Sequence, residues 1–140
     1  MNNNSKTTEK SLRSYDWSGH CILVVEDDFY NYKFLEGWVG MMKAEAIWAE
    51  SGPEAIELCK ERKDISVVIM DVQLPRMNGY DATRFIKECR PDLPVIAATA
   101  SDLEEERIKS EEAGCDGFIE KPIDIKKLTK IVEELLPGSK

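Results

Sequence analysis

Acidic, hydroxyl and lysine side chains follow short apolar runs at four places in the chain. Glu26 and Asp27 follow the first run, and Asp71 follows the third. Thr99 and Lys121 stand near the ends of two later runs. If these runs are parallel strands, their carboxyl ends meet at one edge of a sheet, where open α/β sheets bind ligands. The spacing therefore predicts a cluster of acids, a hydroxyl and a lysine at that edge.

Asp71 is the acid most enclosed by apolar sequence, since it follows Val67–Met70. A carboxylate in that position is partly desolvated and needs a nearby cation to stay ionised. Gathered carboxylates repel one another unless a divalent cation neutralises them, and oxygen ligands without His or Cys favour Mg²⁺. The plainer alternative is that Asp71 caps a loop or the next helix, a role that suits Asp28 at the start of the first helix.

Lys121 and Thr99 also have a plain and a functional interpretation. A loop lysine is usually just solvated, and a strand threonine usually only satisfies β propensity. Beside clustered acids, the Lys121 ammonium could pair with Asp71 or hold a phosphate oxygen, and the Thr99 hydroxyl could donate to the same group. Together these residues describe a site where Asp71 takes a phosphoryl group while Mg²⁺ and Lys121 neutralise charge.

Five short apolar runs alternate with helical patterns along the chain. The runs are Cys21–Val25, Ala46–Ala49, Val67–Met70, Val95–Ala98 and Gly117–Ile119. The first, third and fourth are continuous rather than alternating, which is typical of strands covered on both faces. The alternation predicts an α/β fold, (βα)5 and flavodoxin-like, with a five-stranded parallel sheet in the order 2-1-3-4-5 and helices on both faces.

Four of the helical patterns carry a clear apolar stripe. The stripes are Tyr32-Leu35-Val39-Met42, Ala55-Leu58-Cys59, Ala82-Phe85-Ile86-Cys89 and Ile125-Leu128-Ile131-Val132-Leu135. The segment 103–113 is different, because only Leu103, Ile108 and Ala113 are apolar. We expect it to form a helix with a thin buried stripe, which moves more easily than the others.

Length and composition limit the function further. The chain has 140 residues, with 19 basic and 27 acidic side chains and a formal net charge of −8. We expect one domain over residues 20–137, a disordered lead-in or linker over residues 1–19, and a tail over residues 138–140. The acidic balance argues against nucleic-acid binding, and no apolar run is long enough to span a membrane. Four dispersed cysteines are expected to be reduced, mostly core thiols in a cytoplasmic protein.

Four sequence pieces, in this order, resemble the receiver domain of two-component response regulators over about residues 21–136. The pieces are Ile22–Asp28, Met70–Gly79, Thr99-Ala100 and Lys121-Pro122. The resemblance implies a signalling phosphoacceptor rather than an enzyme with a separate substrate. Asp71 would take a phosphoryl group from the phosphohistidine of a sensor histidine kinase or histidine phosphotransfer domain, and the domain would then switch conformation to control a partner.

The resemblance implies a metal site of defined composition. Asp27, Asp71 and the backbone carbonyl of Gln73 would hold Mg²⁺, and Glu26 would act mainly through water. Two residues depart from the family pattern. Glu26 replaces the commoner Asp, which could alter metal affinity, and Phe29 stands where a proline is frequent.

The resemblance also implies a switch. Lys121 and Thr99 would contact the phosphate, and Phe118 would be the aromatic side chain that rotates inward on activation. Phe118 replaces the tyrosine of chemotaxis-type receivers, so a hydroxyl bond cannot be part of its switch. We expect the signal to pass from Thr99 through Phe118 to the helix over residues 103–113.

Other interpretations remain open at this point. One is a pseudo-receiver that binds partners without taking phosphate. Another is a phosphatase of the haloacid-dehalogenase type, although that pattern has a second Asp where this chain has Gln73. An FMN-binding flavodoxin is less compatible, because no Ser/Thr/Gly-rich loop follows the first run. The chain would be a stand-alone receiver, a relay intermediate, or the receiver of a hybrid histidine kinase, which Asn31 and residues 77–84 resemble.

Overall fold

A five-stranded parallel sheet forms the centre of the computed structural model, which describes residues 11–138. The strands are β1 (Cys21–Val25), β2 (Glu45–Ala49), β3 (Ile65–Asp71), β4 (Val95–Thr99) and β5 (Gly117–Glu120). Their order is β2-β1-β3-β4-β5 and all pairs are parallel, which confirms the predicted α/β fold. The continuous apolar runs β1 and β4 are buried along their whole length, because helices cover both faces of the sheet.

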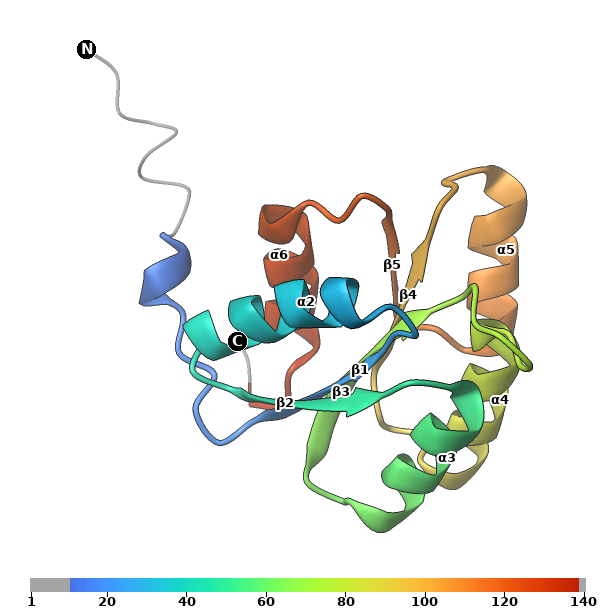
Figure 1. The fold of residues 1–140 in the computed structure, drawn as a ribbon, viewed down its shortest axis with the longest axis horizontal. Helices are drawn as coiled ribbons and strands as arrows, with labels where there is room; N and C mark the ends of the chain where they lie inside the picture. Colours follow the sequence, from blue (N-terminus) through green and yellow to red (C-terminus); the bar gives the residue numbers. More distant parts are fainter. Residues whose placement is uncertain (1–10, 139–140) are drawn as a thin grey trace.

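The helices lie in two layers (Figure 1). Helices α2 (Phe29–Met41) and α6 (Ile125–Leu135) pack on one face; α3 (Gly52–Glu61), α4 (Gly79–Cys89) and α5 (Glu104–Ala113) pack on the other. Side chains of Asp28, Ser51, Asn78 and Asp124 accept backbone N–H bonds at the starts of α2, α3, α4 and α6. These caps satisfy donors that a helix leaves unpaired at its first turn.

The predicted stripe of α4 is wrong at two positions. Phe85 is 49% exposed and Cys89 is also exposed, whereas Ala82 and Ile86 are fully buried. Thr83 takes the place of Phe85 in the buried face, because its hydroxyl donates to the Gly79 carbonyl at 2.8 Å and so loses no hydrogen bond on burial.

The lead-in prediction needs correction for residues 11–19. A short 3₁₀ helix, η1 (Leu12–Ser14), is followed by Tyr15 and Trp17, which are both buried against α2 and α6. The Trp17 indole N–H donates to the Glu133 carboxylate at 2.7 Å. Two aromatic side chains bury enough apolar area to hold a segment that is otherwise polar. The rest of the predicted lead-in, residues 1–10, lies outside the described residues, as do residues 139–140 of the tail.

Among residues 11–138, the helices are too short or too polar to cross a membrane.

Candidate functional site

Three carboxylates converge where β1 and β3 end. Glu26 and Asp27 directly follow β1, and Asp71 is the last residue of β3. One oxygen from each of the three lies within 4.8 Å of the others. Glu26 and Asp71 are each 4% exposed, while Asp27 is exposed to solvent. The sequence predicted this convergence from strand order, since neighbouring parallel strands end at the same edge.

Lys121, which directly follows the edge strand β5, brings a cationic group to this cluster. Its ammonium lies 3.2 Å from Asp71 Oδ1 and 3.7 Å from Glu26 Oε1. The backbone of Lys121 is fixed as well, because its N–H donates to the Thr99 carbonyl at 2.7 Å. One lysine faces three carboxylates, so negative charge is in excess. An all-oxygen set with this charge fits a hard divalent cation such as Mg²⁺.

Backbone contacts fix the Asp71 carboxylate. The N–H of Gln73 donates to Asp71 Oδ1 at 3.0 Å, and the N–H of Val72 donates to the Ala98 carbonyl of β4. Gly79, at the start of α4, lies so close to this segment that a Cβ there would come within 2.7 Å of Val72 Cα. A glycine is therefore required for α4 to pack against the end of β3.

Glu26 is held by bonds from the start of α2. The Asp28 N–H and the Asn31 side-chain amide both donate to Glu26 Oε2, at 3.2 and 3.4 Å. Burial raises the pKa of the Glu26 carboxyl, Lys121 opposes this rise, and the Asp71 charge adds to it. Buried in this way, Glu26 and Asp71 compete for the same lysine.

Thr99 and Phe118 lie next to this cluster on β4 and β5. Thr99 is 3% exposed, and its hydroxyl oxygen accepts the Ser101 N–H at 3.4 Å. Phe118 is half-buried, and the guanidinium of Arg107 from α5 lies 4.7 Å from the centre of its ring. The acids, Thr99 and Lys121 thus all lie at or just beyond the carboxyl ends of their strands, whereas Phe118 lies within β5, beside Ala97 of β4.

Comparison with known proteins agrees with this arrangement. The family model of the response regulator receiver domain matches residues 22–133. The chain belongs to the receiver domain family.

Two kinds of relative support this membership. The polar-differentiation response regulator DivK of Brucella ovis is 32% identical over 119 residues, which cover 82% of this chain and 94% of that protein. The receiver domain of a Pseudomonas aeruginosa sensor histidine kinase, with magnesium in its active-site cleft, is 28% identical with a TM-score of 0.77, covering 84% of this chain and 98% of the other.

A third relative was crystallised with a phosphotransfer protein. This is the receiver domain of the yeast (Saccharomyces cerevisiae) response regulator Ssk1, in complex with the histidine phosphotransfer signalling protein Ypd1. It is 25% identical, has a TM-score of 0.77, and covers 86% of this chain and 94% of its own. The present chain is therefore a phosphoacceptor module of two-component signalling. Neither the pseudo-receiver nor the phosphatase interpretation is favoured.

Sequence reasoning missed one residue of the receiver site. Trp48, on β2, donates its indole N–H to the backbone carbonyl of Glu26 at 2.7 Å. The sequence placed Trp48 on the second strand without bringing its side chain to the acids. Its contact depends on the β1–β2 pairing and on the aromatic side chains of α2, so no local pattern could have indicated it.

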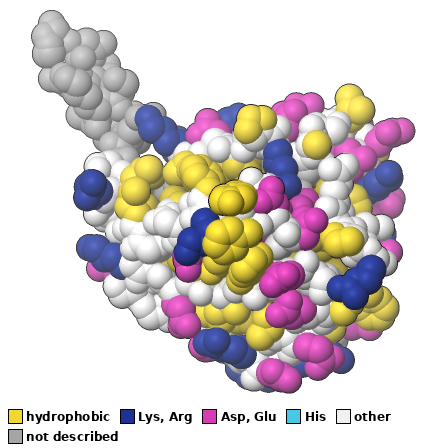
Figure 2. Space-filling model, in the orientation of Figure 1, with side chains coloured by type: hydrophobic (Ala, Val, Ile, Leu, Met, Phe, Trp, Pro, Cys, Tyr) yellow, Lys and Arg dark blue, Asp and Glu magenta, His cyan; other side chains and the backbone are white. Residues whose placement is uncertain are grey.

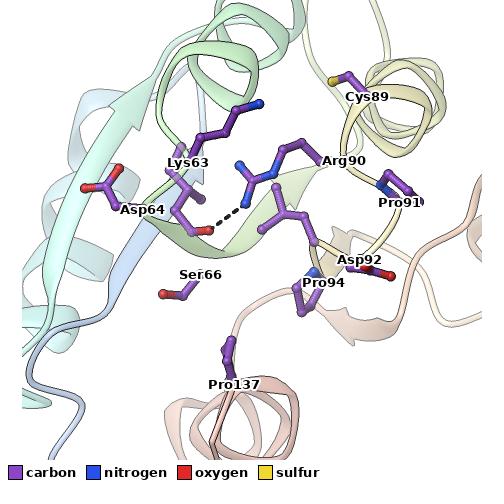
Figure 3. Close-up of a pocket in the computed structure, with 11 residues that line it drawn as sticks. Lys63, Asp64, Ser66, Cys89, Arg90, Pro91, Asp92, Pro94 and Pro137 are labelled. Carbon is purple, nitrogen blue, oxygen red and sulfur yellow. Dashed lines mark hydrogen bonds between the residues drawn. The ribbon is translucent and has the colours of Figure 1, made fainter.

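A cavity lies at the opposite edge of the receiver sheet, where β3 and β4 begin. It has a volume of about 470 Å³ and is lined by Lys63, Asp92 and Arg90 among others (Figure 3). The Arg90 guanidinium donates to the carbonyls of Cys59, Arg62 and Ile65 at 3.1–3.2 Å. Because these carbonyls occupy the guanidinium, Arg90 joins the ends of α3, α4 and β3 rather than offering a charge to a ligand.

The four cysteines are free thiols, as expected, but only partly a core feature. Cys21 and Cys59 are buried, and burial raises the pKa of each thiol to about 11. Cys115 is half-buried and Cys89 is exposed. None of them belongs to the receiver site.

Proposed function

We propose that Asp71 is the phosphoacceptor of this receiver domain. One of its carboxylate oxygens attacks phosphorus, the bond from phosphorus to the donor imidazole nitrogen breaks, and the imidazole leaves with the electron pair. The observation that carries this assignment is the Asp71 carboxylate itself, buried at a strand end and held between Lys121 and the Gln73 N–H. A nucleophile fixed in this way needs little further chemistry, because phosphoryl transfer depends mainly on positioning and charge.

The metal site proposed for this reaction uses oxygen ligands. Asp27, Asp71 and the backbone carbonyl of Gln73 would hold Mg²⁺, and Glu26 would act through water. The close approach of the Glu26, Asp27 and Asp71 carboxylates supports the carboxylate part of this ligand set. When bound, Mg²⁺ neutralises the carboxylates and the phosphoryl oxygens. Lys121 supplies a second positive charge beside Asp71, and it acts as a point charge rather than a directional fork.

Thr99 and Phe118 form the proposed switch. The Thr99 hydroxyl turns from the Ser101 N–H toward a phosphoryl oxygen on Asp71, and Phe118 rotates into the space that is vacated. The present contact of Thr99 is long, at 3.4 Å, so little is lost when it breaks. The domain has no separate substrate and promotes only its own phosphorylation and dephosphorylation. It does so in the cytoplasm, where free thiols such as those of this chain persist.

The phosphodonor is a sensor histidine kinase or a histidine phosphotransfer domain, and we propose that it docks on α2. Tyr30, Phe34 and Met41 are 80%, 56% and 43% exposed, and with Gly37 they follow one ridge of the helix. Hydrophobic side chains gather over α2 in Figure 2. A cavity of about 510 Å³ connects Phe34 to Glu26 and Lys121. An apolar ridge that leads to the acids suits a protein donor.

Comparing phosphorylation by a small-molecule phosphodonor with phosphorylation by a protein phosphodonor separates the docking step from the chemical step. Phe34→Ala is expected to slow phosphoryl transfer from a protein donor found by phosphotransfer profiling. It is expected to leave phosphorylation by acetyl phosphate unchanged, because that donor needs no docking surface. Equal rates from the protein donor would place docking elsewhere.

Intact mass after incubation with acetyl phosphate and Mg²⁺ tests the phosphoacceptor. The wild-type chain is expected to gain one phosphoryl group, and Asp71→Asn is expected to gain none. Asp81→Asn, at an exposed aspartate of α4, is the matched control and is expected to behave as wild type. An unmodified wild-type chain would favour a pseudo-receiver, and turnover of p-nitrophenyl phosphate would favour a phosphatase.

A further inference from the structure

The indole of Trp48 holds the peptide unit that joins Glu26 to Asp27. Its N–H donates to the Glu26 carbonyl at 2.7 Å, which is a short bond for nitrogen and oxygen. The planar peptide links this carbonyl rigidly to the Asp27 nitrogen. One contact from β2 therefore fixes the backbone orientation on which the directions of the Glu26 and Asp27 side chains depend.

This contact replaces a backbone bond at the end of the sheet. The β1–β2 ladder ends at the pair Val25–Ala49, and the Glu26 N–H still donates to the Ala49 carbonyl at 3.0 Å. Beyond that point β2 turns away into α3. The Trp48 side chain then donates to the Glu26 carbonyl. Residues of β2 therefore bind both the N–H and the carbonyl of Glu26.

Aromatic packing fixes the indole in turn. Trp48 stacks on Tyr32 with ring centres 4.6 Å apart and planes inclined by 7°, and Phe29 packs beside it at 5.7 Å. Tyr32 is itself buried, with 6% exposed. Because both partners belong to the first turns of α2, the indole joins β2, the acidic loop and α2 into one unit.

We infer that Trp48 is a positioning residue for the metal site of this receiver domain. It touches neither metal nor phosphate; it acts through the Glu26–Asp27 peptide. This inference rests on the proposed function and extends it to a residue outside the acidic cluster. Without the indole N–H, the Asp27 carboxylate samples more orientations, and Mg²⁺ binding loses part of its preorganisation.

Two variants separate this role from general stability. Trp48→Phe keeps an aromatic ring for Tyr32 but removes the N–H. Trp38→Phe is the matched control, because it also removes an indole hydrogen bond, the 2.9 Å bond from Trp38 Nε1 to the Thr129 hydroxyl. Trp38 lies near the C-terminal end of α2, whereas the acids lie beside the N-terminal end. Mg²⁺ affinity is measured from metal-dependent chemical shifts, phosphorylation with acetyl phosphate, and stability by urea unfolding.

Trp48→Phe is expected to weaken Mg²⁺ binding roughly tenfold, the lower end for residues that support metal ligands from outside. Phosphorylation at a fixed, limiting Mg²⁺ concentration is expected to slow, and saturating Mg²⁺ is expected to restore most of the rate. Trp38→Phe is expected to lower stability and leave Mg²⁺ affinity unchanged. Wild-type affinity in Trp48→Phe, or an equal loss in both variants, would overturn the inference.

The wild-type chain provides a test that needs no variant to fold. The indole N–H resonance of Trp48 is expected to shift when Mg²⁺ is added, while those of Trp17 and Trp38 stay in place. If the Trp48 resonance does not move while Mg²⁺ saturates the site, the positioning role of Trp48 is contradicted but the proposed function is not. A chain that binds Mg²⁺ but is not phosphorylated on Asp71 would instead contradict the proposed function and leave the positioning role standing.

Discussion

At the scale of single residues, the site is a balance between burial and charge. Glu26 and Asp71 are nearly inaccessible to water, and they share Lys121 at 3.7 and 3.2 Å. Each ionised carboxylate loses hydration on burial, and one lysine cannot compensate two acids fully. Without a bound metal, the buried carboxylates carry more negative charge than Lys121 compensates, and this excess favours uptake of a proton or a cation.

Glu26→Gln is expected to stabilise the metal-free receiver at pH 7.5, by an amount on the order of 1 kcal/mol. Burial raises the pKa of Glu26 in the folded state, so protonation of Glu26 favours the fold. That favourable contribution is present at low pH and is lost as the pH rises through the folded-state pKa. The advantage of the amide variant should therefore shrink as the pH falls. Thermal melting in EDTA at several pH values measures this difference.

Glu88→Gln, at an exposed position of α4, serves as the control and is expected to show no such pH dependence. A Glu26→Gln chain that melts below wild type at pH 7.5 would contradict the charge argument. So would a difference that stays constant with pH.

The positions of the acids followed from sequence, whereas the contacts that orient them did not. Glu26, Asp27 and Asp71 end apolar runs, and parallel strands bring such ends together whatever the side chains beside them. Trp48 is different, because its hydrogen bond requires a particular rotamer stacked on Tyr32 of another element. Strand order can be deduced from alternation; the direction of one side chain at a sheet edge depends on tertiary packing.

At the scale of elements, α5 is packed even more thinly than its sequence indicated. Of the three apolar residues expected in its stripe, Leu103 and Ile108 are 62% and 45% exposed, and only Ala113 is buried, together with Ser110. Two polar contacts add to this packing. The Tyr80 hydroxyl of α4 donates to a Glu106 carboxylate oxygen at 2.8 Å, and Arg107 lies over Phe118.

Tyr80→Phe is expected to loosen the start of α5. The variant keeps the buried ring and loses a hydrogen bond worth about 1 kcal/mol, or roughly a fivefold rise in local opening. Faster amide exchange over residues 104–113, with slow exchange kept in β3, is the expected observation. Tyr30→Phe, at an 80% exposed tyrosine, is the matched control. Unchanged protection in Tyr80→Phe would mean that packing alone holds α5.

Beryllofluoride, a phosphoryl mimic, tests whether α5 responds to Asp71. With Mg²⁺ present, chemical-shift changes are expected at Thr99, Phe118 and residues 103–113, because a bound phosphoryl group shifts a two-state population. Thr99→Ala should retain phosphorylation and blunt the distant changes, since it lacks the hydroxyl that the phosphate attracts. Changes confined to the metal site, or distant changes that persist in Thr99→Ala, would break the proposed route.

The segment before β1 is an element that sequence periodicity failed to detect. Trp17 is 2% exposed and packs edge-on against Trp38, with ring centres 5.6 Å apart. A segment without regular periodicity gives no helix or strand signal. Its order depends on two isolated aromatic side chains, Tyr15 and Trp17, that pack against α2 and α6. Apolar residues in a polar stretch are the one local sign that such a segment packs.

Trp17→Ala is expected to destabilise the receiver by about 3–5 kcal/mol, the usual cost of removing a large buried aromatic side chain. Trp17→Phe keeps most of the packing and loses the bond to Glu133, so about 1 kcal/mol is expected. Urea unfolding measures both. If Trp17→Ala unfolds at the wild-type urea concentration, the segment is not part of the cooperative fold.

At the scale of the whole molecule, metal binding at one sheet edge should stabilise the entire chain. A ligand that binds only the folded state adds stability by mass action, and Mg²⁺ at ten times its dissociation constant adds about 1.4 kcal/mol. The melting temperature is therefore expected to keep rising with the logarithm of the Mg²⁺ concentration above the dissociation constant. Because the chain carries a net charge of −8, any salt also screens its self-repulsion, so KCl must hold ionic strength constant. Asp27→Ala should lose the Mg²⁺ increment, while Asp92→Ala, at the opposite sheet edge, should keep it. An Mg²⁺ increment that survives in Asp27→Ala would show that the cation stabilises the chain from somewhere other than the acidic cluster.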